Sequence, residues 1–234
     1  MYIWNDDNFC YLFDVDGTLT PSRGVMDSKF QEWFLYFCHN RNVSLVTGSD
    51  KSKTVEQIGE TIYNACTRVY NCSGNDVYEQ YTQIQFNDWT LPSEVESFLI
   101  DKLNSSPYRI KTGLHIEHRT GMVNFSVVGR NANPEQRKGY YVWDRIVNER
   151  KHIASEFNST FPDLEADIGG ETGIDIFERG RNKSQVLKDF KLSTLKFYGD
   201  RTDPAGNDYS IASKLNPNQV YTVTDWKHCW ELLK

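Results

Sequence analysis

The sequence predicts an α/β fold in which a parallel-sheet core is interrupted by an inserted α+β module. Short apolar runs at residues 9–13 and 194–200 are typical of buried strands, and helical patterns lie between such strands. From residue 78 to residue 178 the pattern changes to alternating strands separated by turns. We therefore expect residues 1–77 and 179–234 to form the core and residues 78–178 to form the module.

Hydrophobic periodicity predicts the elements of the core. A helix begins after Asp27 or Ser28, either of which can cap it, and the apolar side chains that follow share one helical face. Residues 43–47 predict a second buried strand, followed by one helix that carries Val55, Ile58 and Ile62. The remaining elements that we expect are strands at 68–71 and 220–223 and a final helix at 226–233.

The inserted module combines alternating strands with two helices. Residues 77–86 alternate, and residues 108–118 and 122–129 are two alternating strands joined by the Arg-Thr-Gly of a hairpin. One helix begins near Pro92. The other begins at Asn133-Pro134, an N-cap followed by proline at the first helical position. We expect this second helix to run through Trp143, Ile146, Val147, Ala154 and Phe157.

The composition predicts a globular protein and does not exclude a small anionic ligand held in a local basic pocket. Of the 234 residues 38% are hydrophobic, enough for a core, and the net charge of -6 argues against a nucleic-acid partner. The five cysteines are odd in number and lack C-x-x-C spacing, so we expect reduced thiols and a cytoplasmic location. The first residues lack the basic start of a secretory leader, and no apolar run approaches the roughly 18 residues of a membrane span.

Acidic side chains follow two of the predicted strands. Asp14 and Asp16 come after the first strand, Asp200 ends the strand at 194–200, and Asp208 lies on the loop beyond. In an open parallel sheet, ligands bind outside the carboxyl ends of the strands. An isolated Asp-x-Asp is more often a pair of solvated turn residues, but the second acidic strand end favours a site. Carboxylates that converge there need a cation, and oxygen ligands suit Mg²⁺.

Four segments resemble the motifs of the haloacid dehalogenase (HAD) superfamily. They are FDVDGTLT, VTGS, the lysine of NKSQVL and YGDRTDPAGND. The segments DVDGTLTPSR, HRTGMVNFSVVGRNANPEQR and GGETGIDIFERGRNKSQVL resemble, in the same order, segments of the eukaryotic-type phosphomannomutase family. The resemblance covers nearly the whole chain and is weakest between residues 78 and 110. It implies a HAD-like Rossmannoid parallel-sheet core with an inserted α+β cap domain.

The resemblance also implies a phosphoryl-transfer mechanism. Asp14 would be the nucleophile that forms an aspartyl-phosphate, and Asp16 the general acid and base for the sugar oxygen. Lys183 would neutralise the phosphoryl oxygens, and Thr47 or Ser49 would donate a hydroxyl to the same group. The ligands of Mg²⁺ would be Asp14, the Asp16 backbone carbonyl, Asp200 and Asp208.

The cap would hold the rest of the substrate. Arg119, Arg130 and Arg137 match family positions that bind the phosphate remote from the nucleophile, and guanidinium groups suit this because they bind phosphate bidentately. Arg23 matches an arginine near the junction of core and cap. The resemblance further implies a hexose 1,6-bisphosphate activator, a homodimer formed through the cap and a place in mannose metabolism. Asn124 and Asp175 would face the sugar.

Three functions are compatible with the sequence. The first is a Mg²⁺-dependent phosphomutase that interconverts mannose 1-phosphate and mannose 6-phosphate. The second is a sugar-phosphate phosphatase with the same nucleophile, favoured by Thr47 where mutases tend to have glycine and by Gly173 where the family usually has serine. The third is a sugar-phosphate sensor without activity. The cap arginines oppose the second function, and the retained set of acidic residues and lysine opposes the third.

Overall fold

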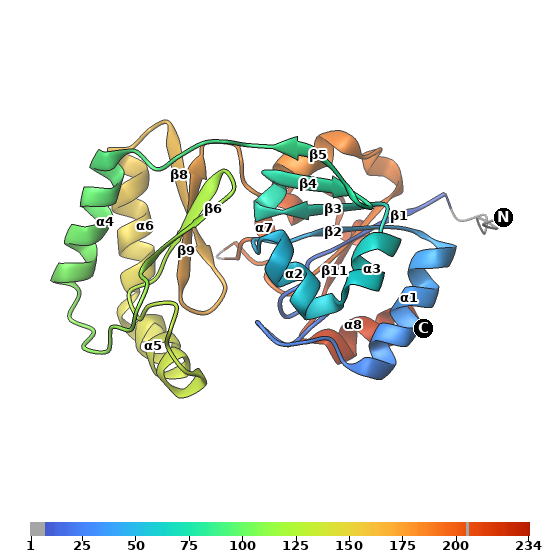
Figure 1. Ribbon diagram of the computed structural model, residues 1–234, viewed down its shortest axis with the longest axis horizontal. Helices are drawn as coiled ribbons and strands as arrows, with labels where there is room; N and C mark the ends of the chain where they lie inside the picture. The colour runs from blue at the N-terminus through green and yellow to red at the C-terminus, as the bar shows by residue number, and fades with distance from the viewer. Residues whose placement is uncertain (1–7, 205) are drawn as a thin grey trace. The chain divides into compact units, whose positions relative to one another are not determined.

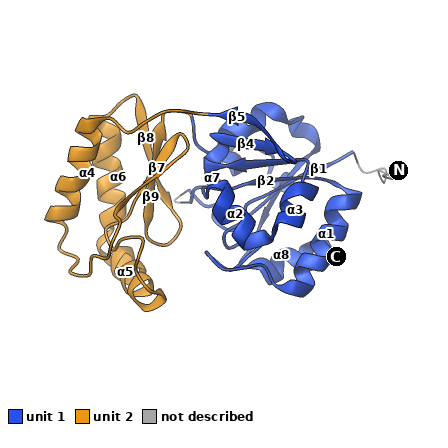
Figure 2. Ribbon diagram, viewed as in Figure 1, with its two compact units in different colours: residues 1–86, 181–234 blue, residues 87–180 orange. Residues whose placement is uncertain are grey.

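The computed structural model describes residues 8–204 and 206–234, and Figure 1 shows its helices and strands. The chain divides into two compact units (Figure 2). The first consists of Met1–Phe86 and Arg181–Lys234, and the second of Asn87–Gly180. Residues 1–7, which include most of the segment that argues against a secretory leader, lie outside the described residues.

A seven-stranded sheet runs through the first unit in the order β11-β10-β1-β2-β3-β4-β5. Neighbouring strands from β11 to β3 are parallel, as the alternation of strands and helices predicts. The pairs β3–β4 and β4–β5 are antiparallel and complete one edge. The strands are β1 (Cys10–Phe13), β2 (Asn42–Val46), β3 (Arg68–Asn71), β4 (Asp76–Glu79), β5 (Thr82–Phe86), β10 (Leu195–Gly199) and β11 (Val220–Thr222).

The helices of the first unit begin largely where the sequence predicts. The Asp27 carboxylate caps the first helix by accepting from the amides of Lys29 and Phe30. The single helix expected through Val55 and Ile62 is wrong, because Gly59 has a φ of +83° and divides it into two helices. The helices are α1 (Ser28–Asn40), α2 (Lys51–Ile58), α3 (Glu60–Ala65), α7 (Tyr209–Ala212) and α8 (Trp226–Leu233), with 3₁₀ turns η1 (Cys72–Gly74), η2 (Lys183–Asp189), η3 (Leu192–Thr194) and η4 (Pro217–Gln219).

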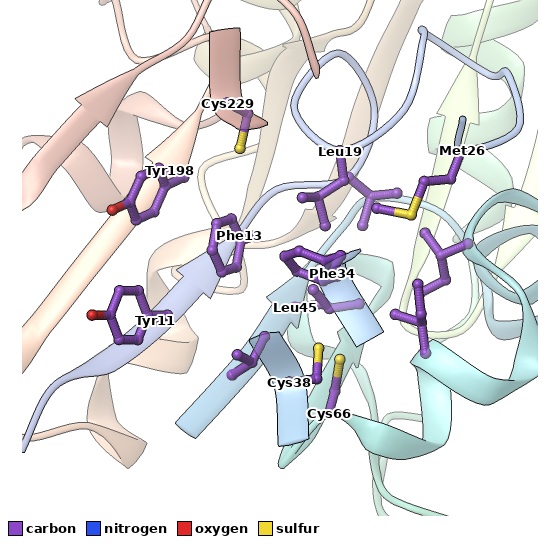
Figure 3. Packing of buried hydrophobic residues seen from close by; sticks show 14 of the residues in the cluster. Tyr11, Phe13, Leu19, Met26, Phe34, Cys38, Leu45, Cys66, Tyr198 and Cys229 are labelled. Atoms are coloured by element: carbon purple, nitrogen blue, oxygen red, sulfur yellow. The ribbon is translucent and has the colours of Figure 1, made fainter. Parts of the chain in front are cut away.

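Aromatic side chains fill the core between the sheet and the helices α1 and α8. Phe34 of α1 lies edge-on to Phe13 of β1, with 5.3 Å between the ring centroids (Figure 3). Phe30, one turn earlier on α1, stacks on Trp230 of α8 at 5.3 Å. Cys38 packs in the same cluster, and all five cysteines are free thiols. This packing fixes the end of β1, from which the acidic segment follows.

The hairpin β4–β5 belongs to the first unit. The sequence placed most of residues 77–86 in the inserted module, but β4 pairs with β3 through the Val77–Tyr70 register. The division between the units therefore falls after Phe86 rather than after Val77. The alternating pattern predicts a strand here but does not indicate which sheet the strand joins. Its pairing with β3 assigns it to the core sheet.

The second unit is a four-stranded antiparallel sheet, ordered β6-β7-β9-β8, with three helices. One face of the sheet is apolar and packs with the helices through Val123, Phe125, Leu99 and Phe157. The other face carries most of the polar side chains of these strands. The elements are α4 (Ser93–Ser105), β6 (Ile116–Arg119), β7 (Met122–Phe125), α5 (Pro134–Val147), α6 (Glu149–Thr160), β8 (Leu164–Gly169) and β9 (Gly173–Glu178).

Three expectations for the second unit need correction. The helix that begins at Asn133-Pro134 forms with a complete capping box, but it ends at Asn148, whose φ of +58° is left-handed, and a separate helix follows. Ile146, expected on its apolar face, is 76% exposed. Residues 108–115 form no strand, so the first strand of the hairpin begins at Ile116. The strands β8 and β9 were not predicted.

Among the described residues, no helix is both long enough and apolar enough to cross a membrane.

Replacing Phe34 by alanine should lower the free energy of unfolding of the first unit by about 3–5 kcal/mol, because a fully buried ring is lost and a cavity remains. Tyr36→Ala is the control, since Tyr36 lies on the same helix but is 68% exposed. Its effect should stay within about 0.5 kcal/mol. Urea denaturation followed by circular dichroism measures both variants, and equal losses would contradict the packing shown in Figure 3.

Candidate active site

Asp14 and Asp16 lie immediately after β1, where the chain leaves the sheet. The Asp14 amide donates to the Tyr198 carbonyl at 2.9 Å, which continues the pairing with β10. The chain then turns at Gly17, whose φ is +86°. A Cβ at this glycine would lie 2.4 Å from Asp200 Oδ2, so only glycine permits the two acidic segments to approach this closely.

Lys183 connects two buried carboxylates. Its Nζ donates to Asp14 Oδ1 at 2.6 Å and to Asp208 Oδ1 at 2.7 Å. The exposed fractions of Asp14, Lys183 and Asp208 are 4%, 2% and 0%. Burial alone would lower the pKa of Lys183, but the two carboxylates outweigh it and raise that pKa, so the side chain is an ammonium ion. Lys183 therefore places a fixed positive charge beside the Asp14 carboxylate.

Three acidic residues form a group that fits a divalent cation. Carboxylate oxygens of Asp14, Asp200 and Asp208 lie within 4.8 Å of one another. Burial raises the pKa of Asp14 although Lys183 opposes the shift, and burial together with Asp208 raises the pKa of Asp200 to about 7. Three carboxylates face one ammonium group, which leaves an excess of negative charge when all three are ionised. All the ligand atoms are oxygens, which is the donor set that Mg²⁺ prefers.

The Asp16 carboxylate is not part of that acidic group and is held by other contacts. Its Oδ1 accepts from the Arg23 amide at 2.6 Å and from Gln57 Nε2 at 2.9 Å. Its Oδ2 accepts from Ser49 Oγ at 3.3 Å. Arg23 has a φ of +57°, so its backbone is in the left-handed region where it turns its amide toward Asp16. The sequence singled out neither Gln57 nor this role of the Arg23 backbone.

The loop after β2 carries Thr47 and Ser49 and is fixed by backbone contacts. The Thr47 carbonyl accepts from the Ser73 amide at 2.8 Å, and the Ser49 carbonyl accepts from the Cys72 amide at 2.9 Å. Thr47 Oγ1 accepts from the Ser49 amide at 3.1 Å. Thr47 is buried, and the Ser49 hydroxyl contacts Asp16, so these two hydroxyl groups have different surroundings.

In the second unit, one row of polar residues crosses all four strands. Glu117 of β6 is paired with Asn124 of β7, Asn124 with Asp175 of β9, and Asp175 with Asp167 of β8. Directly paired residues project from the same face of a sheet, so the row lies opposite the apolar face. Burial, Glu165 and Asp175 raise the pKa of Asp167 to about 7. The sheet therefore presents a polar face rich in carboxylates.

The three arginines that the sequence assigned to the cap are paired with acids of the same unit. Arg119 Nε donates to Glu117 Oε2 at 2.8 Å, and Arg130 Nη2 lies 2.9 Å from the same oxygen. Burial alone would raise the pKa of Glu117, but these two arginines outweigh it and lower that pKa. Arg137 Nη2 lies 3.2 Å from Glu171 Oε2, so its acidic partner differs from that of the other two arginines. The importance of Glu117 becomes visible only once strand register is known.

Asn124 and Asp175 contact each other, as neighbours on paired strands can. Asn124 Nδ2 donates to Asp175 Oδ1 at 2.7 Å. A Cβ on Gly173 would lie 2.4 Å from Asn124 Nδ2, so this pair occupies the space that a side chain at residue 173 would need. The serine that the family usually carries at this position would require Asn124 to move.

The fold and the acidic site define a class of protein. A parallel core sheet with aspartates after its first strand, a buried lysine and a second acidic loop is the arrangement of HAD-like proteins. A sugar phosphatase of HAD subclass IIB has a TM-score of 0.58 and 15% identity, over 97% of this chain and 98% of that chain. A haloacid dehalogenase-like hydrolase from Bacteroides thetaiotaomicron has a TM-score of 0.52 and 13% identity, over 87% and 84%. These similarities confirm the predicted fold class.

Sequence comparison narrows the class to a family. A model of the eukaryotic phosphomannomutase family matches residues 30–231. A phosphomannomutase of Arabidopsis thaliana is 34% identical over 86% of this chain and 85% of the relative. A phosphomannomutase of Drosophila melanogaster is 31% identical over 94% and 92%. The chain belongs to the eukaryotic phosphomannomutase family, which confirms the resemblance inferred from its motifs.

Mg²⁺ should stabilise the protein against heat, because a cation bound only by the folded state adds about 2.7 kcal/mol at a hundredfold excess over its dissociation constant. Asp200→Asn should abolish most of this increase in the melting temperature. Asp203→Asn should keep it, since Asp203 lies on the same loop but outside the acidic group. Differential scanning fluorimetry at constant ionic strength makes the comparison, and an equal response of both variants would contradict the assigned ligands.

Proposed function

We propose that this protein is a Mg²⁺-dependent phosphomannomutase that interconverts mannose 1-phosphate and mannose 6-phosphate through an aspartyl-phosphate on Asp14. The observation that carries the proposal is the 2.6 Å contact between Lys183 Nζ and Asp14 Oδ1 in a chain of this family. Burial disfavours an ionised Asp14, and the ammonium group favours it. Mg²⁺, when bound by Asp14, Asp200, Asp208 and the Asp16 carbonyl, supplies positive charge that offsets repulsion between the nucleophile and an anionic substrate.

Asp14 and Asp16 take separate parts in the reaction. Phospho-Asp14 gives its phosphoryl group to the 6-hydroxyl of mannose 1-phosphate, and Asp16 accepts the proton of that hydroxyl. The resulting 1,6-bisphosphate turns round and returns its other phosphoryl group to Asp14, while Asp16 returns the proton to the departing sugar oxygen. Lys183 and a hydroxyl of Thr47 or Ser49 neutralise or donate to the phosphoryl oxygens. A hexose 1,6-bisphosphate is needed to phosphorylate Asp14 first.

The arginines of the second unit account for a mutase rather than a phosphatase. Arg119, Arg130 and Arg137 bind the phosphate that is not being transferred, with Arg23 as a further contact to substrate. This assignment is supported by the ion pairs of the three arginines. Their guanidinium groups contact the carboxylates of Glu117 and Glu171, which are oxyanions like phosphate. A dianionic phosphate replaces part of these contacts. Asn124 and Asp175 bind sugar hydroxyls.

The remaining parts of the proposal concern assembly and location. We propose a homodimer formed through the second unit, and the exposed Val142 and Ile146, one turn apart on α5, support such a contact. The free cysteines support a reducing, cytoplasmic location. There the enzyme acts in mannose metabolism, in the branch that leads to GDP-mannose.

A phosphatase is the second candidate, and Gly173 is the observation that favours it. Residue 173 has no side chain, so the hydroxyl donor that the family usually has there is missing, and the Asn124 amide lies 2.4 Å from the position of a Cβ. In that case water, instead of the second sugar hydroxyl, receives the phosphoryl group from Asp14. Family membership and the paired arginines favour the mutase.

Phosphorus NMR distinguishes the two candidates. With mannose 1-phosphate and Mg²⁺, mannose 6-phosphate should appear only after a trace of glucose 1,6-bisphosphate is added. Asp14→Asn should abolish this turnover, because the nucleophile is gone. Steady release of inorganic phosphate without isomerisation would favour the phosphatase, and binding without turnover would favour the sensor. Full activity of Asp14→Asn would refute the aspartyl-phosphate mechanism.

Replacing Arg137 by methionine should reduce mutase turnover on the order of 100-fold, because a charge-assisted contact with the second phosphate is lost. Hydrolysis of 4-nitrophenyl phosphate, which has no second phosphate, should change less than about threefold. Arg145→Met is the matched control, since Arg145 lies on the same helix and is exposed. Kinetic assays with both substrates test this, and equal losses with both substrates would contradict the assigned role.

A further inference from the structure

Gln57 lies buried near the end of α2 and has no role in the mechanism described so far. Its exposed fraction is 0%. Its Nε2 lies 2.9 Å from Asp16 Oδ1, 3.3 Å from Thr20 Oγ1 and 3.4 Å from the Gly24 carbonyl oxygen. The backbone carbonyl oxygen of Gln57 accepts from the Met26 amide at 2.8 Å. Gln57 thus ties α2 to the loop that follows the catalytic segment.

The contacts determine which end of the amide faces that loop. A carboxylate and a carbonyl oxygen only accept hydrogen bonds, so the NH₂ group must point to Asp16 and Gly24. Gln57 Oε1 then lies buried, and it has no hydrogen-bond partner among the described residues. An unsatisfied buried acceptor costs about 1–3 kcal/mol. An apolar side chain of similar length would avoid this cost, but it would leave Asp16 Oδ1 without this donor.

The donors around Asp16 distinguish its two carboxylate oxygens. Oδ1 accepts from the Arg23 amide and from Gln57, at 2.6 and 2.9 Å. Oδ2 has one described partner, the Ser49 hydroxyl, at the longer distance of 3.3 Å. A hydroxyl group can turn and can accept as well as donate, whereas the two N–H donors cannot. Oδ2 therefore has the weaker and more adaptable of the two sets of contacts.

We propose that Gln57 is a positioning residue that fixes the rotation of the Asp16 carboxyl group, so that Oδ2 exchanges the proton with the sugar oxygen. This inference rests on the proposed function. As the sugar O–H bond breaks and the new O–P bond forms, the proton passes to Oδ2. In the reverse transfer the P–O bond breaks, and Oδ2 returns the proton to the departing sugar oxygen.

Two substrates with different leaving groups distinguish the orientation of Asp16 from a general effect of Gln57 on the site. A sugar alkoxide is a strong base and needs a proton as it leaves, so its transfer depends on a correctly oriented acid. The 4-nitrophenolate ion is stable near neutral pH and leaves without a proton. A side chain that merely maintains the site would affect both substrates alike, whereas a side chain that orients the acid affects the sugar phosphate selectively.

Gln57→Met keeps the length of the side chain and removes its donor. We expect kcat for mannose 1-phosphate with glucose 1,6-bisphosphate to fall about 100-fold, within the range that general acid–base catalysis contributes, with KM changed less than about threefold. In the first turnover, before phospho-Asp14 has to be hydrolysed, the rate of 4-nitrophenolate release should change less than about threefold. Gln31→Met is the matched control, because Gln31 Nε2 donates to the Ile58 carbonyl at 2.8 Å and has no described contact with a carboxylate.

Equal losses with both substrates, or unchanged kcat for the sugar phosphate, would overturn the role of Gln57. If Gln57→Met does not fold, Gln57→Asn makes the same comparison, because it keeps an amide but is too short to hold Oδ1, and the same selective loss is expected. Failure of the proposed function gives a different result: wild-type protein and Asp14→Asn would then behave alike with both substrates, which refutes the phosphoryl transfer itself and with it this inference.

Discussion

The buried contact of one ammonium group with two carboxylates, Lys183 with Asp14 and Asp208, is the interaction on which the core site depends. It joins the end of β1, the start of η2 and the residue before α7, which are far apart in the sequence. Removing three charged groups from water costs several kcal/mol for each, so a buried ion pair is weak evidence for a role in stability. The arrangement is therefore explained better by phosphoryl transfer, which needs a fixed positive charge beside the nucleophile, than by stability.

The two units arrange their charged groups differently. In the first unit three carboxylates face one ammonium group, and this excess of negative charge attracts a cation. In the second unit Glu117 is shared by Arg119 and Arg130, and Arg119 also lies 3.8 Å from Asp175, so guanidinium groups and carboxylates are interleaved there. A sugar bisphosphate has two phosphates with different requirements. The phosphate that is transferred needs its charge neutralised, and the other phosphate needs to be bound firmly. The proposed function assigns these two tasks to residues of separate units.

Local patterns predicted much of the structure, and long-range contacts account for the rest. The first strand, the helix capped by Asp27 and the acidic strand ends follow from periodicity and capping. The break at Asn148 depends on one left-handed residue within a helical pattern, which periodicity does not detect. The Gln57 contact with Asp16 spans 41 residues, and the pairing of Glu117 with two arginines depends on register. Such contacts leave no local signal, so the family resemblance proposed Asp14, Asp16 and Lys183 for the site but did not point to Gln57 or Glu117.

The site at which the protein becomes phosphorylated tests the central claim most directly. Protein incubated with Mg²⁺ and glucose 1,6-bisphosphate can be quenched in acid, digested and mapped by mass spectrometry. The phosphoryl group should be on Asp14, and hydroxylamine should remove it, because an acyl phosphate is labile to that nucleophile. A phosphoryl group on Asp16 or another residue, or turnover of mannose 1-phosphate without any phosphorylated peptide, would contradict the account.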